Sequence, residues 1–218
     1  MSMPVEPRKV EQGAKRIRTY VDGQVVADTT RPLLVWEDRP YPTYYLPAAD
    51  VRRPELGKVV TIDGYDGEYV RFGWNDMDAW FEEDEEVYVH PRDPHSRVDI
   101  LPSSRSVRVE RDGVVLAEST HPSILFETGL PPRWYIPKVD VRMDLLQHTD
   151  TATRCPYKGT AEYWAARVGD RLLPDLAWSY RTPLPESERI AGMICFYNER
   201  VDLFVDGELQ ERPKTPFS

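Results

Sequence analysis

The sequence of this chain contains an internal repeat. The segment VDGQVVADTTRPLLVWEDRPYPTYYLPAADVR, which begins at Val21, aligns without a gap with RDGVVLAESTHPSILFETGLPPRWYIPKVDVR, which begins at Arg111. The offset is 90 residues throughout this segment. Two copies at this period predict a pair of tandem domains, because a solenoid needs at least three repeats to bury a continuous core.

Beyond this segment the alignment needs larger offsets. Trp80 matches Trp178 at an offset of 98, and Val98 matches Val201 at an offset of 103. On this alignment the second copy carries about eight extra residues before Trp178. The segment RCPYKG, residues 154–159, lies in that stretch, so the two copies are expected to differ there.

Both copies have the sequence pattern of short β-strands. RIRTYVDGQVVA and SVRVERDGVVLA alternate apolar and polar residues on either side of an Asp-Gly pair, which is a strong hairpin signal. The 20 prolines favour short strands and turns over long helices. We therefore predict a mainly β protein made of two tandem domains, each with small antiparallel sheets and one or two short helices. DVRMDLLQ and PESERI are the expected helices.

The domain limits follow from the repeat and from LPSSRS, residues 101–106, where Pro and Ser indicate a linker. We expect a disordered N-terminal tail over residues 1–14 and a first β domain over 15–103. The second β domain is expected over 104–210, followed by a C-terminal tail over 211–218.

Composition narrows the classes of partner. The net charge of −9 argues against nucleic-acid binding, which needs clustered Lys and Arg. No apolar run is long enough to span a membrane, and the N-terminal sequence lacks the apolar region of a secretory signal. Two cysteines cannot form a disulfide framework. We expect a cytoplasmic protein with no nucleic-acid and no membrane partner.

Two polar clusters have the residue types of a metal site but not the spacing. The acidic run Glu82–Glu86 lacks EF-hand spacing and is more typical of a solvated loop. In HPRDPH the prolines indicate an irregular turn at a strand end, so His90, Asp93 and His95 would converge on a metal only by chance. No metal and no cofactor is expected.

Cys155, in RCPYKG, is a candidate nucleophile. A thiolate is the reactive form, and the nearby cations Arg154 and Lys158 would favour it. Neighbours in a strand point to opposite faces, however, and no histidine is placed by its spacing as a general base. Cys155 is therefore either a catalytic nucleophile or, as we favour, a packed residue of a pocket wall.

Aromatic residues are concentrated in the second copy and are interleaved with Arg, Lys and Asn. Flat apolar walls with a few polar anchors are typical of a small-molecule pocket, although aromatic residues in β domains also form the core. The aromatic residues concerned are Trp134, Tyr135, Tyr157, Tyr163, Trp164, Trp178, Tyr180 and Tyr197.

From about Arg16 to Gly207 the chain resembles the domain of unknown function 427 family, in its tandem bacterial form. The stretches that carry the resemblance are RDGVVLAES, HPSILFETGLPPRWYIPKVDVRMDLL, RCPYKGTAEYW, DLAWSY and FYNERVDLFVDG. It implies β-tent-like domains, in which two small antiparallel sheets are pinned over a pocket. Members of the family are also labelled nucleotidyltransferase-like; Asp76 and Asp78 of NDMD fit that chemistry, but a Gly-Ser element is absent.

The resemblance also implies which residues are motif positions. In the second copy these are Tyr135, Cys155, Tyr157, Lys158, Trp178, Tyr197 and Asn198. In the first copy they are Tyr45, Trp80, His90 and Arg92.

The predicted function is binding of an unknown small polar or aromatic molecule, in a pocket of the second domain and in a second such pocket of the first. The alternatives are an enzyme with Cys155 as nucleophile, a nucleotidyl transferase, and a protein-interaction module. The sequence leaves the ligand and the oligomeric state open.

Overall fold

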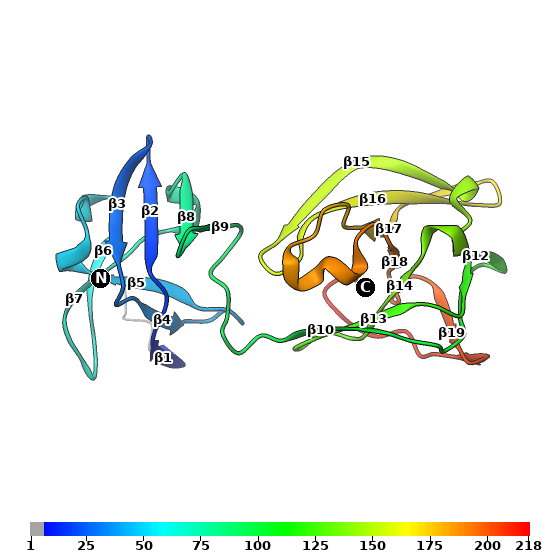
Figure 1. Ribbon diagram of the computed structural model, residues 1–218, viewed down its shortest axis with the longest axis horizontal. Helices are drawn as coiled ribbons and strands as arrows, with labels where there is room; N and C mark the ends of the chain where they lie inside the picture. Colours follow the sequence, from blue (N-terminus) through cyan, green and yellow to red (C-terminus); the bar gives the residue numbers. More distant parts are fainter. Residues whose placement is uncertain (1–6) are drawn as a thin grey trace. The chain divides into compact units, whose positions relative to one another are not determined.

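The computed structural model describes residues 7–218 and is mainly β, which confirms the predicted fold class. The chain forms two compact units, and the boundary between them in the sequence falls between Asp93 and Pro94. Each unit consists of two antiparallel sheets, one larger than the other (Figure 1). No helix in residues 7–218 is long and apolar enough to cross a membrane.

The first unit combines a five-stranded sheet with a four-stranded sheet. The large sheet has the order β1 (Lys9–Gln12), β4 (Leu33–Trp36), β5 (Thr43–Pro47), β7 (Tyr65–Arg71) and β6 (Lys58–Ile62). The small sheet has the order β3 (Gln24–Thr29), β2 (Ile17–Val21), β8 (Ala79–Glu82) and β9 (Glu85–Val87).

The second unit has the same plan with a wider large sheet of seven strands. Its order is β10 (Val98–Pro102), β13 (Ser123–Glu127), β14 (Arg133–Ile136), β18 (Ile194–Phe196), β17 (Arg171–Ser179), β16 (Gly159–Val168) and β15 (Leu146–Cys155). The small sheet has the order β12 (Val114–Ser119), β11 (Val107–Arg111), β19 (Asp202–Val205) and β20 (Glu208–Leu209).

The Asp-Gly hairpins form as predicted. Asp22 and Gly23 join β2 to β3 with φ angles of 52° and 70°, and Asp112 and Gly113 join β11 to β12 with 51° and 77°. Two successive positive φ angles are those of a type I′ turn, whose twist matches that of the flanking strands.

The expected helices are 3-10 turns instead of α-helices. Within DVRMDLLQ only Asp140, the end of one 3-10 turn, and Met143–Leu145 are helical, because β15 begins at Leu146 and pairs with β16. PESERI forms the longest turn, η6 (Pro185–Ile190). The other turns are η1 (Ala48–Asp50), η2 (Pro54–Leu56), η3 (Trp74–Asp76), η4 (Lys138–Asp140) and η5 (Met143–Leu145).

The strand registers correct the second half of the repeat alignment. Thr19 in β2 lies opposite Trp80 in β8, and its repeat equivalent Val109 in β11 lies opposite Leu203 in β19. Trp80 is therefore the counterpart of Leu203, and its match to Trp178 was wrong. Ala79-Trp80 lies in the small sheet and Ala177-Trp178 in the large sheet, so the identity of the two dipeptides does not reflect equivalent positions.

The extra segment of the second unit is also much longer than the repeat alignment indicated. Tyr45 in β5 pairs with Arg71 in β7, and its equivalent Tyr135 in β14 pairs with Cys195 in β18, so β18 takes the place of β7. Beside it β17 takes the place of β6, which leaves β15 and β16 without counterparts. We call this additional hairpin, residues 146–168, the insert. It widens the large sheet and carries RCPYKG at its tip.

The ends of the units differ from the expected limits. Residues 9–12, expected in a disordered tail, form β1, which pairs with β4; residues 1–6 lie outside the described part of the chain. Residues 98–102, expected in the first domain, form β10, which pairs with β13 of the second unit. These two strands are themselves repeat equivalents, since Lys9 lies opposite Trp36 and Asp99 lies opposite Phe126, at the same offset of 90.

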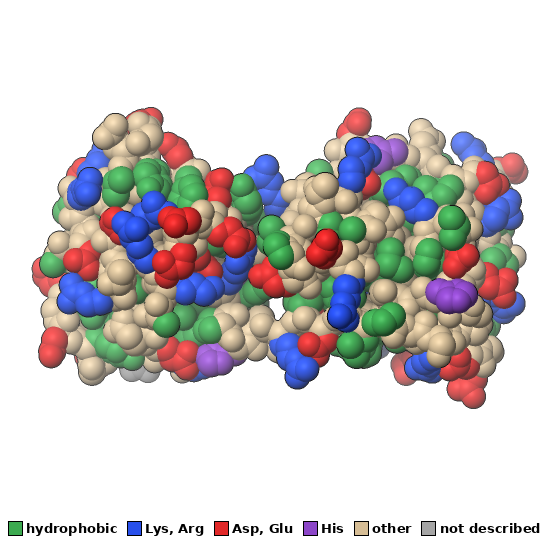
Figure 2. Space-filling model, in the orientation of Figure 1, with side chains coloured by type: hydrophobic (Ala, Val, Ile, Leu, Met, Phe, Trp, Pro, Cys, Tyr) green, Lys and Arg blue, Asp and Glu red, His purple; other side chains and the backbone are tan. Residues whose placement is uncertain are grey.

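In each unit the main apolar core contains residues of both sheets and lies between them. A second apolar cluster covers the opposite face of the large sheet. The acidic run 82–86 is not simply solvated: it forms the β8–β9 hairpin, and Arg18 binds Asp84 at 2.7 Å while Lys15 pairs with the buried Glu82. On the face shown in Figure 2, acidic and basic side chains are interspersed on each unit.

Candidate functional site

The first unit contains a cavity of about 320 Å³. It lies where the end of β7, the η3 turn and the segment after β9 come together. Its wall is formed by Glu37, Arg39, Tyr41, Pro42, Thr43, Tyr44, Arg71, Phe72, Gly73, Trp74, Asn75, Asp76, Trp80, Val89, His90 and Pro91.

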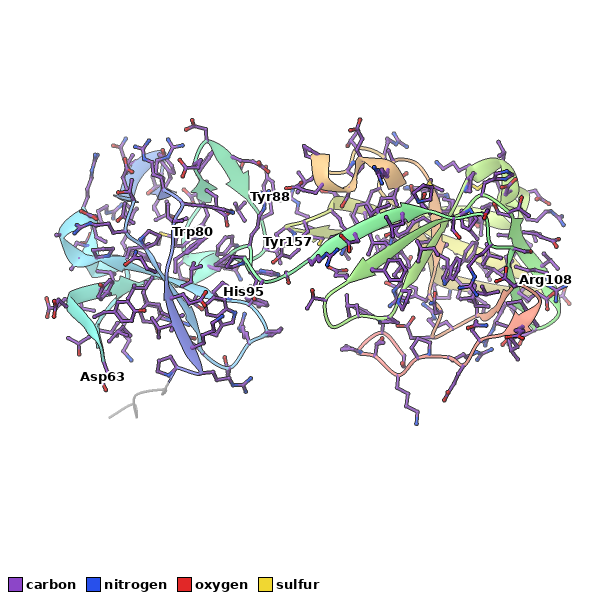
Figure 3. The ribbon with its side chains drawn as sticks, turned by 60° about the horizontal axis from the view of Figure 1, so that its bottom comes forward. Asp63, Trp80, Tyr88, His95, Arg108 and Tyr157 are labelled. Carbon is purple, nitrogen blue, oxygen red and sulfur yellow. The ribbon has the colours of Figure 1, made fainter. Side chains whose placement is uncertain are left out.

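Two stacked aromatic pairs form much of this wall. Trp74 and Trp80 stack with ring centroids 5.1 Å apart and an angle of 10° between the planes. Tyr41 and His90 stack at 3.8 Å and 7°. The indole of Trp80 also donates a hydrogen bond to the carbonyl of Trp74 at 3.1 Å, which fixes this pair, and Figure 3 labels Trp80 inside the first unit. Flat aromatic faces of this kind bind planar ligands by stacking.

The polar part of the wall is organised around Glu37. Its Oε1 accepts hydrogen bonds from Tyr45 Oη at 2.7 Å and from Arg71 Nε at 2.8 Å, and its Oε2 accepts one from Arg71 Nη2 at 3.1 Å. The hydrogen bond from Arg71 holds the pKa of Glu37 below its ordinary value, and burial raises the pKa of Tyr45. Glu37 is therefore ionised and Tyr45 protonated at neutral pH.

Two guanidinium groups retain free donors at the cavity. Arg71 uses Nε and Nη2 on Glu37, and Arg39 uses Nη1 on Tyr41 Oη at 2.8 Å. Tyr45 also lies within hydrogen-bonding reach of Arg71, but a guanidinium has five N–H groups, so among residues 7–218 each of these two side chains keeps N–H groups with no acceptor. They can therefore receive a carboxylate or another anionic group of a ligand.

His90 faces the cavity as a neutral imidazole. Burial lowers its pKa below the ordinary value of 6.5, although Pro91 O lies 2.7 Å from Nδ1. Of the other residues predicted for this unit, Tyr45 supports Glu37 from behind the wall. Arg92 also lies outside the wall, where its backbone N–H donates to Glu82 and its side chain pairs with Glu85.

In the second unit the predicted residues Tyr135, Trp178 and Tyr197 are part of a packed cluster, whereas Asn198 lines a cavity of about 270 Å³. Tyr135 and Trp178 are 1% and 7% exposed, and the Trp178 indole donates to Tyr135 Oη at 3.1 Å. Tyr197 packs on Trp178 at 4.6 Å between ring centroids, and Asn198 donates to the carbonyl of Pro132 at 2.9 Å. The structure thus brings Tyr135, Trp178 and Tyr197 together, but as a core.

Two larger side chains occupy part of the place that is open in the first unit. Thr43 of the cavity wall is replaced at the same ladder position by Arg133, and Gly73 is replaced by Tyr197. The equivalence of Gly73 and Tyr197 rests on the turns that follow β7 and β18. In the first turn the Asp76 N–H donates to the Gly73 carbonyl, and in the second the Arg200 N–H donates to the Tyr197 carbonyl. Gly73 also allows a close approach, since a Cβ there would lie 2.2 Å from the Asp76 carboxylate.

Arg133 is held by a buried carboxylate. Its two terminal nitrogens each donate to Glu199 at 2.7 Å, and its guanidinium lies over the ring of Trp178 at 5.6 Å. Burial alone would raise the pKa of Glu199, but hydrogen bonds from Arg133 and Thr215 outweigh it and the pKa lies below its ordinary value. This ion pair occupies part of the space that corresponds to the first-unit cavity.

The residues of RCPYKG lie at the tip of the insert. Lys158 is buried and pairs with Glu127, and the carbonyl of Tyr157 accepts from Ser187 at 3.2 Å. Cys155 is partly buried at the end of β15, opposite Gly159. Among residues 7–218, no group of three or more His, Cys, Asp or Glu is placed to hold a metal ion.

Sequence reasoning missed several residues of the cavity. Tyr41 and Trp74 could have been found, since both are aromatic and lie near predicted positions. Thr43 and Gly73 gave no signal, because their role emerges only when the larger residues at the equivalent positions are seen.

A comparison with protein-family models supplies the family. A model described as Domain of unknown function (DUF427) matches residues 9–68 and 99–207. The chain belongs to the DUF427 family. No curated protein matches the sequence. The starts of the two DUF427 segments, at residues 9 and 99, share the offset of β1 and β10, and the second segment includes the whole insert. The resemblance seen in the sequence is thus confirmed.

Proposed function

We propose that this DUF427 protein binds a small planar molecule with an acidic group in the cavity of the first unit. The observation that carries the proposal is the pairing of two aromatic stacks with two incompletely used guanidinium groups in one wall. The cavity volume of about 320 Å³ lies at the lower end of the range for small-molecule pockets, which is about 300–1,000 Å³.

Each part of the wall has a role in this proposal. A planar ring packs on the exposed faces of the Trp74 and Tyr41 stacks, where it gains apolar burial and stacking. A carboxylate accepts hydrogen bonds from Arg71 and Arg39, and Glu37 keeps Arg71 oriented toward it. The ligand is therefore an aromatic acid or a molecule of similar shape and charge.

The proposal moves the ligand site from the second unit, favoured by the sequence, to the first. The reason is physical: the aromatic residues Tyr135 and Trp178 of the second unit are used in its core, and Arg133 and Tyr197 occupy part of the equivalent space.

A thermal-shift screen against planar aromatic carboxylates tests the proposal. A ligand at about 100 times its Kd adds about 2.7 kcal/mol of stability to the unit that binds it. Trp74→Ala removes half of one stack at a partly exposed position and should abolish the shift, whereas Leu172→Ala, at an exposed apolar residue of the second unit, should leave it unchanged. A shift that survives Trp74→Ala would place the ligand elsewhere.

A further inference from the structure

Residues 213–218 lie against the second unit at the place that corresponds to the first-unit cavity. Thr215 Oγ1 donates a hydrogen bond to Glu199 Oε1 at 2.6 Å. The ring of Phe217 lies 6.0 Å from the ring of Tyr197 and 5.9 Å from the guanidinium of Arg133. The segment 211–218, expected to be a tail, thus makes specific contacts.

The correspondence between the two places rests on wall residues. A second cavity of about 270 Å³ lies beside these contacts and includes Pro213 of the segment in its wall. Five of its wall positions are repeat equivalents of wall positions in the first-unit cavity. The equivalent pairs are Pro131 and Tyr41, Pro132 and Pro42, Trp134 and Tyr44, Asn198 and Trp74, and Leu203 and Trp80.

The segment is held weakly compared with the residues before it. Arg212 is anchored by hydrogen bonds to the Val201 carbonyl at 3.1 Å and to Asp202 at 2.6 Å. Beyond Arg212, Thr215 to Glu199 is the one hydrogen bond that ties the segment to the rest of residues 7–218. Phe217 remains 46% exposed. Segments with so few buried contacts open at low free-energy cost.

The segment also closes a turn on itself. The Thr215 N–H donates to Ser218 Oγ at 3.0 Å, and the Ser218 N–H donates to the Thr215 carbonyl at 3.1 Å. Its backbone groups therefore need no partner in the second unit, so it can leave without uncovering strand hydrogen bonds.

We propose that residues 213–218 are a displaceable cap over a second ligand site, separate from the first-unit cavity. The chemistry of the cap defines the ligand class. A ligand of this site has an aromatic ring, which replaces Phe217 against Arg133 and Tyr197, and a hydroxyl or ammonium donor, which replaces Thr215 on Glu199. Such a ligand binds by competing with the chain's own segment.

A peptide with the sequence of the cap, acetyl-PKTPFS, carries this chemistry and serves as the probe. Fluorescence anisotropy of the labelled peptide is measured with the full-length chain, with Thr215→Ala/Phe217→Ala and with the control Lys214→Ala, which changes an exposed residue of the same segment. The resident cap acts at a high effective concentration, of the order of mM for a short tether. The double variant, whose cap lacks both contacts, should therefore bind the peptide at least tenfold more tightly than the wild type and the control.

Two results would overturn the proposal. One is the absence of peptide binding to the double variant while circular dichroism shows that it is folded. The other is equal binding of acetyl-PKAPAS, which lacks the hydroxyl of Thr215 and the ring of Phe217. Equal binding would show that the contacts of these two side chains are unspecific. Hydrogen exchange of the wild type gives an independent check: the amides of residues 213–218 should exchange much faster than those of β14 and β18, and equal protection would mean a fixed surface element.

Discussion

Glu37 and Arg71 are joined by two hydrogen bonds, at 2.8 and 3.1 Å, in the first unit's large sheet. Glu37 follows β4 and Arg71 ends β7, and β5 lies between these two strands. The acid is a repeat position, and its equivalent Glu127 also binds a cation. That cation is Lys158, which comes from the insert. The carboxylate is thus common to both units, but its cationic partner differs. In the first unit the partner is Arg71, which lies in the cavity wall, and in the second it is Lys158, which anchors the β15–β16 hairpin.

Replacing Glu37 by Gln should destabilise the first unit by about 1–2 kcal/mol, because Arg71 loses its charged partner in a half-buried place. Urea unfolding followed by tryptophan fluorescence measures the loss. The pKa of Glu37 is lowered by Arg71, so its contribution is fully present above the ordinary carboxyl pKa of about 4.3 and is lost as pH falls through the lower folded value. An equal difference between wild type and variant at pH 7 and at pH 2 would contradict this assignment.

His90 should make the first unit less stable in mild acid. Burial lowers the pKa of His90 in the folded chain. Below about pH 6.5 the unfolded chain therefore binds a proton that the folded chain does not, and the stability decreases as the pH is lowered. His90→Gln should flatten the dependence between pH 7 and pH 5, whereas His121→Gln, at an exposed position in the second unit, should not. A slope that persists in His90→Gln would assign it to other groups.

Lys158 should act as a structural anchor of the β15–β16 hairpin. Lys158→Ala leaves Glu127 partly buried without its cation and should cost the second unit about 2–4 kcal/mol in urea unfolding. Lys158→Met, which keeps the volume of the side chain, should cost clearly less. Because both variants remove the cation, equal effects would show that the lost charge and not packing decides the result.

The two cysteines should differ in reactivity. Cys195 is fully buried, its thiol donates to the Phe196 carbonyl, and burial raises its pKa, so it should resist alkylation in the folded protein. Cys155 is partly exposed and should be labelled first. Mass spectrometry after iodoacetamide treatment should show one label, absent in Cys155→Ser; prompt double labelling of folded protein would contradict the buried position of Cys195.

Much of the fold was predictable because local signals and the repeat agree. The Asp-Gly turns fixed the hairpins β2–β3 and β11–β12, and the constant offset of 90 related β4 to β13 and β5 to β14. The alignment failed after the 3-10 turns. There the insert separates equivalent strands, and no local pattern tells which strand pairs with β14.

The candidate site was predictable only in part. The motif positions Trp80 and His90 do line the first-unit cavity, but Tyr135 and Trp178 belong to a core. An aromatic residue has the same sequence signature in a wall and in a core, because both uses bury a flat apolar ring. What separates them here is the size of the side chain at two equivalent pairs, which are Thr43 with Arg133 and Gly73 with Tyr197.

The central claim is that the open space around Thr43 makes the first unit a binding site. Isothermal titration calorimetry with the strongest ligand from the aromatic-acid screen tests it on Thr43→Arg/Asn75→Glu, which rebuilds the pair of Arg133 and Glu199 inside the cavity. The control Thr30→Arg/Gln24→Glu introduces the same two charged side chains at exposed positions. We expect at least a tenfold loss of affinity in the first variant and none in the control. Unchanged affinity in the folded cavity variant would show that the ligand does not bind there.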